Sequence, residues 1–511
     1  MPLSSPFRRM LVAALSVCAL FLVNPGVGSA LGKGGVIRAG AAKVDITNRD
    51  VPLVNDPLHA RALVLEQGET KVVLIALDVV SLGEIGYVRN DYLGKVRTQL
   101  QQEFNIDPRN VLINASHCHG IPCTDIDQRT VQAVREAVGR LVPVRVGAGR
   151  GEERRIMENR RLKLKSGKEA DVRHAYSLPP DEEVVGVGPV DTEIGLLKLE
   201  RDDGTTLAAV YNFACHPIQG VPSGGNTADV TGFSSKVIED NLGEGAVALF
   251  FQGCGGDINP VFYKDVDHPR DAEPLGNMLG LSTLSGLRSI RCQPGGTLKV
   301  INETLALPRR FDGAERLESM QAEQTRLLES LGGTSLNLKT FLPLAVKYKL
   351  SSDFPSYYSH RYLHDKQIGR NELSLLDAEN RRNMEAYLRN IHTMEHLSRL
   401  RVNMALVRKH KAANEAAGQR TVDVEVVGLR IGEFVLVTFP GELTVQIGLN
   451  IKKGAPQKTT FVAGYTNGYI YYAPTAEQIL AGEAQEDCDS ILAPEWQALY
   501  EARMAELLKK L

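Results

Sequence analysis

The chain has 511 residues, of which 43% are hydrophobic and 23% are charged, a composition typical of a globular protein with a sizeable core. Its formal net charge of −2 at pH 7 offers none of the basic excess on which nucleic-acid binding normally depends, so no nucleic-acid partner is expected. No fixed-period repeat or long low-complexity tract is present, which argues against a solenoid or a disordered chain.

The first 30 residues have the pattern of a secretory signal peptide. Arg8 and Arg9 precede an apolar run from Met10 to Val23, and small residues follow as far as Ala30. We expect cleavage after Ala30, and hence a secreted or periplasmic protein. The alternative is a retained membrane anchor, which is less favoured because the apolar run is short for a span.

Export would permit disulfide bonds. Of the seven cysteines, Cys18 lies within the expected signal peptide, which leaves six, an even number whose pairing the sequence does not fix. Cys118, Cys215 and Cys254 lie inside candidate site motifs. A thiolate ligand or nucleophile is one interpretation of these three, and a small buried residue is the preferred one.

Strand-like and helix-like segments alternate from Val36 to about Val300. The expected elements are strands at 61–66, 71–78, 111–114 and 246–251, and a helix at 125–141. This alternation predicts an α/β fold with a mostly internal mixed sheet.

The composition changes between Asp312 and about Gln419. This stretch is rich in Leu, Glu, Arg, Ala and Met and has few turn signals, so several helices are expected. Residues 421–437 return to a β pattern, and residues 494–511 predict a terminal amphipathic helix. No linker is evident, so we expect residues 31–511 to form one catalytic domain with a helical insertion at about 312–419.

Nitrogen and oxygen donors follow several of the apolar runs. They are His117 and His119, His216, Glu442, and a tyrosine cluster from Tyr465 to Tyr472. Imidazole, carboxylate and phenolate groups are all accepted by a borderline cation such as zinc. If residues 117–119 are extended, both imidazoles point to one side, and one could bind metal while the other orients substrate or moves protons.

Other catalytic patterns are weak or absent. Gly253–Asp257 is dense in glycine after a strand, so its N–H groups could approach a ligand, but it lacks the spacing of a dinucleotide fingerprint. A tight turn is an equal alternative for this segment. No nucleophile elbow accompanies a credible triad, which disfavours a serine hydrolase.

Six motifs, in order from about Val36 to Ser490, resemble those of the neutral/alkaline, non-lysosomal ceramidases. They are His117–Pro122, Asn212–His216, Ala228–Phe233, Gly256–Pro260, Pro440–Thr444 and Gly468–Ile470. The resemblance therefore implies a ceramidase-like catalytic domain.

The resemblance also implies a zinc ion bound by His117, His216, Glu442 and Tyr469, with water activated by that zinc attacking an amide carbonyl. In this scheme His119 is the proton shuttle. Arg160, in a segment similar to the family's Asn-Arg-Ser, would stabilise the developing oxyanion. The alternative for Arg160 is a solvated basic loop, since its neighbours include three further arginines.

The sequence departs from the family pattern in three places. Asn259 stands where the family has a serine beside the zinc, and an amide can donate a hydrogen bond to an oxyanion but cannot be a nucleophile. A family tyrosine is replaced within Gln485–Asp487. After these motifs the sequence continues only to residue 511, so we do not expect the family's C-terminal β-sandwich domain. Because of these departures, a substrate other than ceramide remains an alternative.

The leading hypothesis is an exported, zinc-dependent hydrolase of linear amides, with N-acylsphingosine (ceramide) as the default substrate. One alternative keeps the zinc but changes the substrate to a polar N-acyl or ester compound such as a sugar derivative. Another is a non-catalytic binding protein that retains the fold, for which Asn259 is the main support. The expected partner is a small-molecule or lipid substrate, with peripheral contact at a membrane surface allowed, and the oligomeric state is not determined.

Overall fold

The computed structural model describes residues 35–172, 178–221, 224–263, 265–482 and 484–511. The expected signal peptide, residues 1–30, lies outside these ranges. Within them, no helix is both long and apolar enough to cross a bilayer.

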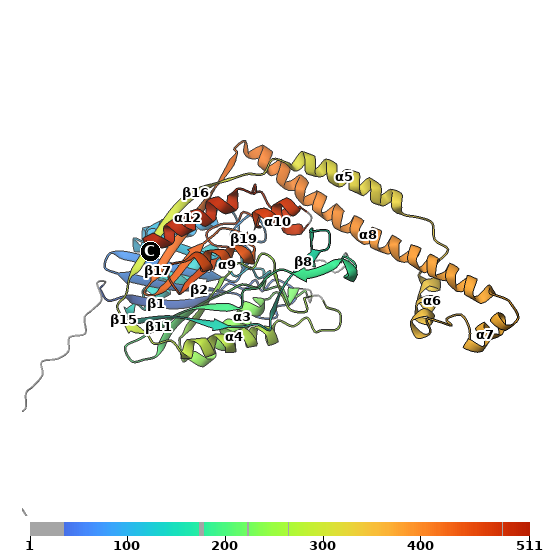
Figure 1. Cartoon of the computed structure of the whole chain (residues 1–511). Coiled ribbons are helices and arrows are strands. Elements are labelled where there is room, and N and C mark those ends of the chain that lie inside the picture. Colours follow the sequence, from blue (N-terminus) through green and yellow to red (C-terminus); the bar gives the residue numbers. More distant parts are fainter. Residues whose placement is uncertain (1–34, 173–177, 222–223, 264, 483) are drawn as a thin grey trace, which may run out of the picture.

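Three mixed sheets form the body of the protein (Figure 1). The first has the order β4-β3-β2-β1-β5, with β1 (Arg38–Asp45), β2 (His59–Gln67), β3 (Thr70–Leu77), β4 (Val111–Ala115) and β5 (Val142–Pro143). The second has the order β13-β12-β11-β6-β15, with β6 (Arg145–Glu152), β11 (Glu193–Glu200), β12 (Thr206–Phe213), β13 (Val247–Gln252) and β15 (Gln293–Pro294). The third has the order β16-β17-β18-β20, with β16 (Leu298–Pro308), β17 (Thr421–Ile431), β18 (Phe434–Thr438) and β20 (Thr460–Ala463).

Among the described residues, three smaller sheets lie outside these. They are β10 (Val184–Val187) with β8 (Arg161–Leu164) and β9 (Glu169–Asp171), β14 (Ile258–Pro260) with β7 (Met157–Asn159), and β19 (Glu442–Leu443) with β21 (Tyr472–Ala473). The two-stranded pairs bring segments that are distant in sequence next to each other, which matters for the site described below.

The strands are apolar on both faces because each face meets a different core. In β2, Ala62 and Val64 belong to the core under the first pair of helices, whereas Leu63 and Leu65 belong to the core between the sheets. Side chains alternate along a strand with a period of two, so a strand buried on both sides reads as a continuous apolar run. The expected strands at 61–66, 71–78, 111–114 and 246–251 are confirmed.

Helices cover the outer faces of the sheets. The first sheet is covered by α1 (Tyr92–Phe104) and α2 (Ile126–Val138), and the second by α3 (Asp229–Leu242) and α4 (Glu273–Arg288). The third packs against α9 (Val445–Gly454) and α12 (Trp496–Lys510). Two short helices, α10 (Ala476–Ala481) and α11 (Gln485–Cys488), precede α12. The α/β class with an internal mixed sheet is therefore confirmed.

Four helices lie between β16 and β17, and we call them the helical arm. They are α5 (Gly313–Ser330), α6 (Leu338–Leu350), α7 (Ser359–Gln367) and α8 (Glu372–Ala417). In Figure 1, α5 and the long α8 run side by side, and α6 and α7 lie at the end of the arm farthest from the sheets. Near its carboxyl end, α8 returns to the body, where His410 pairs with Asp489 at 2.5 Å.

Candidate metal centre

The candidate site lies where several strands end. Each large sheet contains one parallel pair among the described residues, β3 with β4, β12 with β13, and β18 with β20. Parallel strands carry their carboxyl ends to the same edge, where the following loops meet. His117 follows β4, His216 follows β12, Glu442 follows β18 and Tyr469 follows β20.

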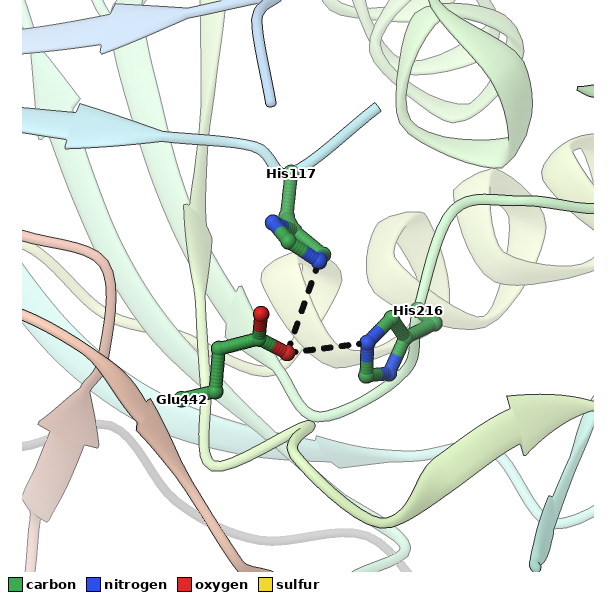
Figure 2. Close-up of side chains that lie close together, drawn as sticks. All are labelled: His117, His216 and Glu442. Carbon is green, nitrogen blue, oxygen red and sulfur yellow. Dashed lines mark hydrogen bonds and ion pairs between the residues drawn. The ribbon is translucent and has the colours of Figure 1, made fainter. Parts of the chain in front are cut away.

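Three buried side chains converge on one point where these loops meet. His117, His216 and Glu442 are all buried, and one potential ligand atom from each lies within 4.8 Å of the others. Oε2 of Glu442 lies 3.1 Å from Nε2 of His216 and 3.5 Å from Nε2 of His117. Figure 2 shows both imidazoles pointing toward this carboxylate.

Backbone carbonyls fix the tautomer of both imidazoles. Nδ1 of His117 lies 2.7 Å from the carbonyl oxygen of Val80, and Nδ1 of His216 lies 3.0 Å from that of Ile258. A carbonyl oxygen only accepts, so Nδ1 carries the proton in each ring and donates it there. The Nε2 lone pairs of the neutral rings are then left facing Glu442.

Burial keeps both rings neutral, and the groups around Glu442 keep its carboxylate charged. Desolvation lowers the pKa of His117 to about 4, and desolvation together with the charge of Arg160 lowers the pKa of His216. Burial alone would raise the pKa of Glu442, but the two histidines and Tyr469 hold it far below its usual value. Two lone pairs and an anion thus face one another, an arrangement that a shared cation stabilises.

Two tyrosines bond the same carboxylate. The hydroxyl of Tyr469 donates to Oε1 of Glu442, and the hydroxyl of Tyr465 donates to Oε2 at 3.2 Å. Burial and the adjacent carboxylate raise the pKa of both phenols. Tyr469 therefore contacts the candidate metal centre through Glu442, and Tyr465 is a second contact that the sequence indicated only as part of a tyrosine cluster.

The segment that carries His117 and His119 is not a strand, contrary to the extended conformation considered from the sequence. His117 has a φ of 69°, in the left-handed region that non-glycine residues seldom adopt. Backbone of this kind concentrates at functional sites, where the surrounding structure holds it. The turn buries His117 and leaves His119 exposed, with ring centroids 5.5 Å apart.

Arg160 is buried beside the site, so the solvated-loop alternative is wrong. Its Nη2 donates to the carbonyl oxygen of Gly256 at 2.5 Å and to the hydroxyl of Tyr472 at 3.1 Å, and its Nη1 donates to Oδ1 of Asn259 at 3.3 Å. Its Nε donates to Glu486 at 2.6 Å. These four bonds use four of the five N–H groups of a guanidinium.

A cavity of about 200 Å³ opens onto this group. His119 and Arg160 line it together with the residues that converge on Glu442, and Asp489 contributes a further carboxylate to its wall. Its apolar lining includes Ile85, Ile218 and Val221. Asn259 is 2% exposed and contacts Arg160, so it lies behind the guanidinium.

The cysteines play no ligand role in this arrangement. All six in the described residues are free, so no disulfide forms among them. Burial raises the pKa of Cys118 and Cys215 well above the usual range, which keeps both as thiols. This agrees with the preferred interpretation of these residues as small and buried.

Sequence reasoning missed the groups that support the site from the C-terminal region. Glu486 bonds Arg160, and Asp489 reaches the cavity wall, where His410 of the helical arm holds it. From the sequence, the segment Gln485–Asp487 was notable only because a tyrosine of the family is replaced there. An isolated acidic residue in a sequence carries no signal for a partner hundreds of positions away.

Comparison with solved structures decides the fold. The neutral ceramidase from Pseudomonas aeruginosa superposes with a TM-score of 0.59 at 17% sequence identity, covering 93% of this chain and 74% of that chain. The chain has the neutral ceramidase fold. A ceramidase complexed with C2 gives a TM-score of 0.58, also at 17% identity, over 93% of this chain and 75% of that chain.

Similarity to the neutral ceramidases at the sequence level is short. The neutral ceramidase of Mycobacterium tuberculosis is 35% identical over 85 residues, which is 16% of this chain and 13% of that protein's length. No protein-family model matches the chain. The resemblance inferred from short motifs is therefore confirmed at the level of the fold, and the activity is argued separately below.

Proposed function

We propose that the protein is a zinc-dependent hydrolase of amide bonds and that His117, His216 and Glu442 hold the metal. The observation that carries this proposal is the pair of neutral imidazole lone pairs facing one buried, charged carboxylate. Two imidazole nitrogens and a carboxylate oxygen form a donor set that catalytic zinc sites use. The backbone carbonyls on Nδ1 supply the outer hydrogen bonds that orient such ligands.

Tyr469 is the proposed fourth ligand. Its phenol already contacts Glu442, and it lies on the cavity wall. A zinc ion bound here would polarise a substrate carbonyl and lower the pKa of water. The remaining chemistry falls to the side chains around it.

Arg160 would stabilise negative charge on the substrate's carbonyl oxygen. Its positive charge is secure: burial by itself lowers the pKa of this group, but Tyr472, Glu486 and Glu442 raise it well above its usual value. The bonds to Glu486, Gly256 and Tyr472 fix its plane, so little reorganisation is needed when charge develops. Asn259 acts through Arg160 as a positioning residue, because its amide lies behind the guanidinium.

His119 would move protons between the substrate and solvent. Its ring is exposed and lines the cavity, and an imidazole has one nitrogen that can accept a proton and another that can donate one. The leaving amine of an amide needs such a proton. Export by a signal peptide over residues 1–30, and one catalytic domain over residues 31–511, belong to the same proposal.

Ceramide is the default substrate because the fold is that of the neutral ceramidases. A second candidate, a short and polar N-acyl compound, is favoured by the cavity itself. Its volume of about 200 Å³ is below the 300–1,000 Å³ typical of sites for drug-sized ligands, and its wall carries Asp489, Arg160 and His119. A survey of N-acyl substrates separates the two, since turnover of only short, polar acyl compounds would reject ceramide.

The first test is elemental analysis of the purified protein beside the Glu442→Gln variant. We expect about one zinc per chain in the wild type and none in the variant. The glutamine amide is neutral, so it cannot replace the charged carboxylate as a ligand of the cation. The matched control is Glu303→Gln, which alters a carboxylate on β16 that pairs with Arg503 of α12. Zinc retained in Glu442→Gln, or absent from the wild type after zinc is added, contradicts the proposal.

A second test separates a hydrolase from a non-catalytic binding protein. Metal-loaded wild type should hydrolyse at least one N-acyl substrate, and the His216→Ala variant should not. Equal turnover by both proteins would show that the metal centre is not the catalyst.

A further inference from the structure

Helix α6, at the far end of the helical arm, exposes a continuous apolar stripe. Leu338 is 60% exposed, Leu342 52%, Val346 56% and Leu350 81%. Residues four apart lie on one face of a helix, so these side chains form one row. Single exposed apolar residues are ordinary on a protein surface, whereas an aligned row is not.

The opposite face of α6 is packed, so the direction of the stripe is fixed. The ring of Phe341 lies 4.8 Å from that of Tyr387 on α8, measured between centroids. The hydroxyl of Tyr348 donates to Oδ1 of Asp377 on α8 at 2.9 Å. The hydroxyls of Ser356 and Tyr362 also donate to Asp377, which ties α6, the following loop and α7 to the long helix.

All charged side chains of α6 are positive. The helix contains Lys339, Lys347 and Lys349 and no aspartate or glutamate. At 100° per residue, Lys339 and Lys349 fall within the exposed face that carries the stripe. A helix with an exposed apolar row, lysines on the same face and no acidic group has the character of one that lies in the interface of an anionic membrane.

Two exposed tyrosines follow α6 in the same part of the arm. Tyr357 and Tyr358, in the loop after α6, are 56% and 80% exposed, and tyrosine is enriched where a protein meets the headgroup region. The far end of the arm projects from the body, so a flat surface can reach it (Figure 1). A second copy of the chain fits less well, because a symmetric contact through this stripe would oppose three lysines with three lysines.

We propose that the exposed face of α6 docks on the surface of a bilayer that contains anionic lipids. Leu338, Leu342, Val346 and Leu350 enter the boundary of the acyl chains, and the lysines meet the headgroups. This goes beyond the proposed hydrolase and does not depend on it, because no residue of the metal centre takes part. If the substrate is a lipid, the arm brings the enzyme to its source.

The test is sedimentation of the purified protein with vesicles of phosphatidylcholine, with and without phosphatidylglycerol. The stripe variant is Leu342→Ser with Val346→Ser, and the charge variant is Lys339→Gln with Lys347→Gln and Lys349→Gln. The matched control, Leu281→Ser with Leu499→Ser, removes two leucines that are 59% and 47% exposed on α4 and α12. Circular dichroism and zinc content establish that each variant is folded with its metal centre intact.

We expect the wild type and the control to bind the anionic vesicles equally. The stripe variant should bind at least about tenfold more weakly, since two apolar side chains no longer leave water. The charge variant should lose the preference for phosphatidylglycerol, and added salt should weaken wild-type binding. Three results overturn the proposal: undiminished binding by the stripe variant, no binding by the wild type, or a wild-type dimer that the stripe variant converts to monomer.

Discussion

Arg160 and Glu486 form a buried ion pair, with 2.6 Å between Nε and Oε1 and side chains that are 1% and 0% exposed. The two residues are 326 positions apart, and their contact joins the segment before β8 to the short helix α11. A buried charge without its partner is costly, so this pairing decides where the guanidinium lies. It directs Arg160 to the wall of the cavity beside Glu442.

Replacing Glu486 by glutamine should therefore impair catalysis without removing the metal. The amide can still accept a hydrogen bond but no longer fixes the guanidinium by charge, so we expect kcat to fall by about tenfold to a hundredfold with a smaller change in KM. Steady-state kinetics and zinc content are the measurements. The control is Asp487→Asn, whose carboxylate bonds Arg161, at 3.2 Å, and not Arg160. An equal fall in kcat in both variants would point to general loss of structure.

The two tyrosines on Glu442 provide a matched pair. If Tyr469 is the fourth ligand, Tyr469→Phe should weaken zinc affinity by about tenfold to a hundredfold, whereas Tyr465→Phe removes only a hydrogen bond of 3.2 Å. Competition with a chromogenic chelator measures both affinities. Similar weakening in the two variants would show that the phenols act only by orienting the carboxylate.

Gly256 allows the close approach that places Glu442. A Cβ at this position would lie 2.7 Å from the carbonyl oxygen of Glu442 and 2.8 Å from that of Leu443, and backbone cannot move aside as a side chain can. Gly256→Ala should therefore cost about 1–3 kcal/mol of unfolding free energy and weaken zinc binding. At Gly454 a Cβ meets nothing within 4 Å, so Gly454→Ala is the control. The prediction fails if denaturant unfolding places both variants at wild-type stability.

His59 should contribute to acid sensitivity. Its Nδ1 is buried with no hydrogen-bond partner among the described residues, and burial together with the charge of Arg61 lowers the pKa of the ring to about 4. Between pH 6.5 and 4 the unfolded chain thus binds more protons at this site than the folded protein does, so the contribution of His59 to stability is lost as pH falls.

Urea unfolding at two pH values checks the effect of His59. Between pH 6.5 and pH 5, the wild type should lose about 1–2 kcal/mol more stability than His59→Gln, because all other titrating groups are common to both proteins. An identical loss in the two proteins would mean that the ring accepts its proton in the folded state.

Several of the strands, and the loops after them that carry the candidate ligands, could be predicted from sequence. Apolar runs precede His117, His216 and Glu442. Such a run is visible in a few consecutive residues, and it indicates a strand that is buried on both faces. The composition of residues 312–419 likewise predicted helices, and α5 to α8 lie there. What the sequence did not provide was the left-handed conformation at His117, because non-glycine residues seldom adopt it and nothing in the neighbouring sequence marks it.

The sequence by itself determined which side chains are available for a metal centre: two imidazoles, a carboxylate and a phenol, each at the end of an apolar strand. Only the tertiary structure decided that they meet. His216 and Glu442 are 226 residues apart, and their contact exists because separate parallel pairs bring their carboxyl ends to one edge. The outward stripe of α6 is decided in the same way, by the packing of its other face on α8. Local patterning depends on neighbours within a few residues, whereas these relationships depend on packing between distant segments.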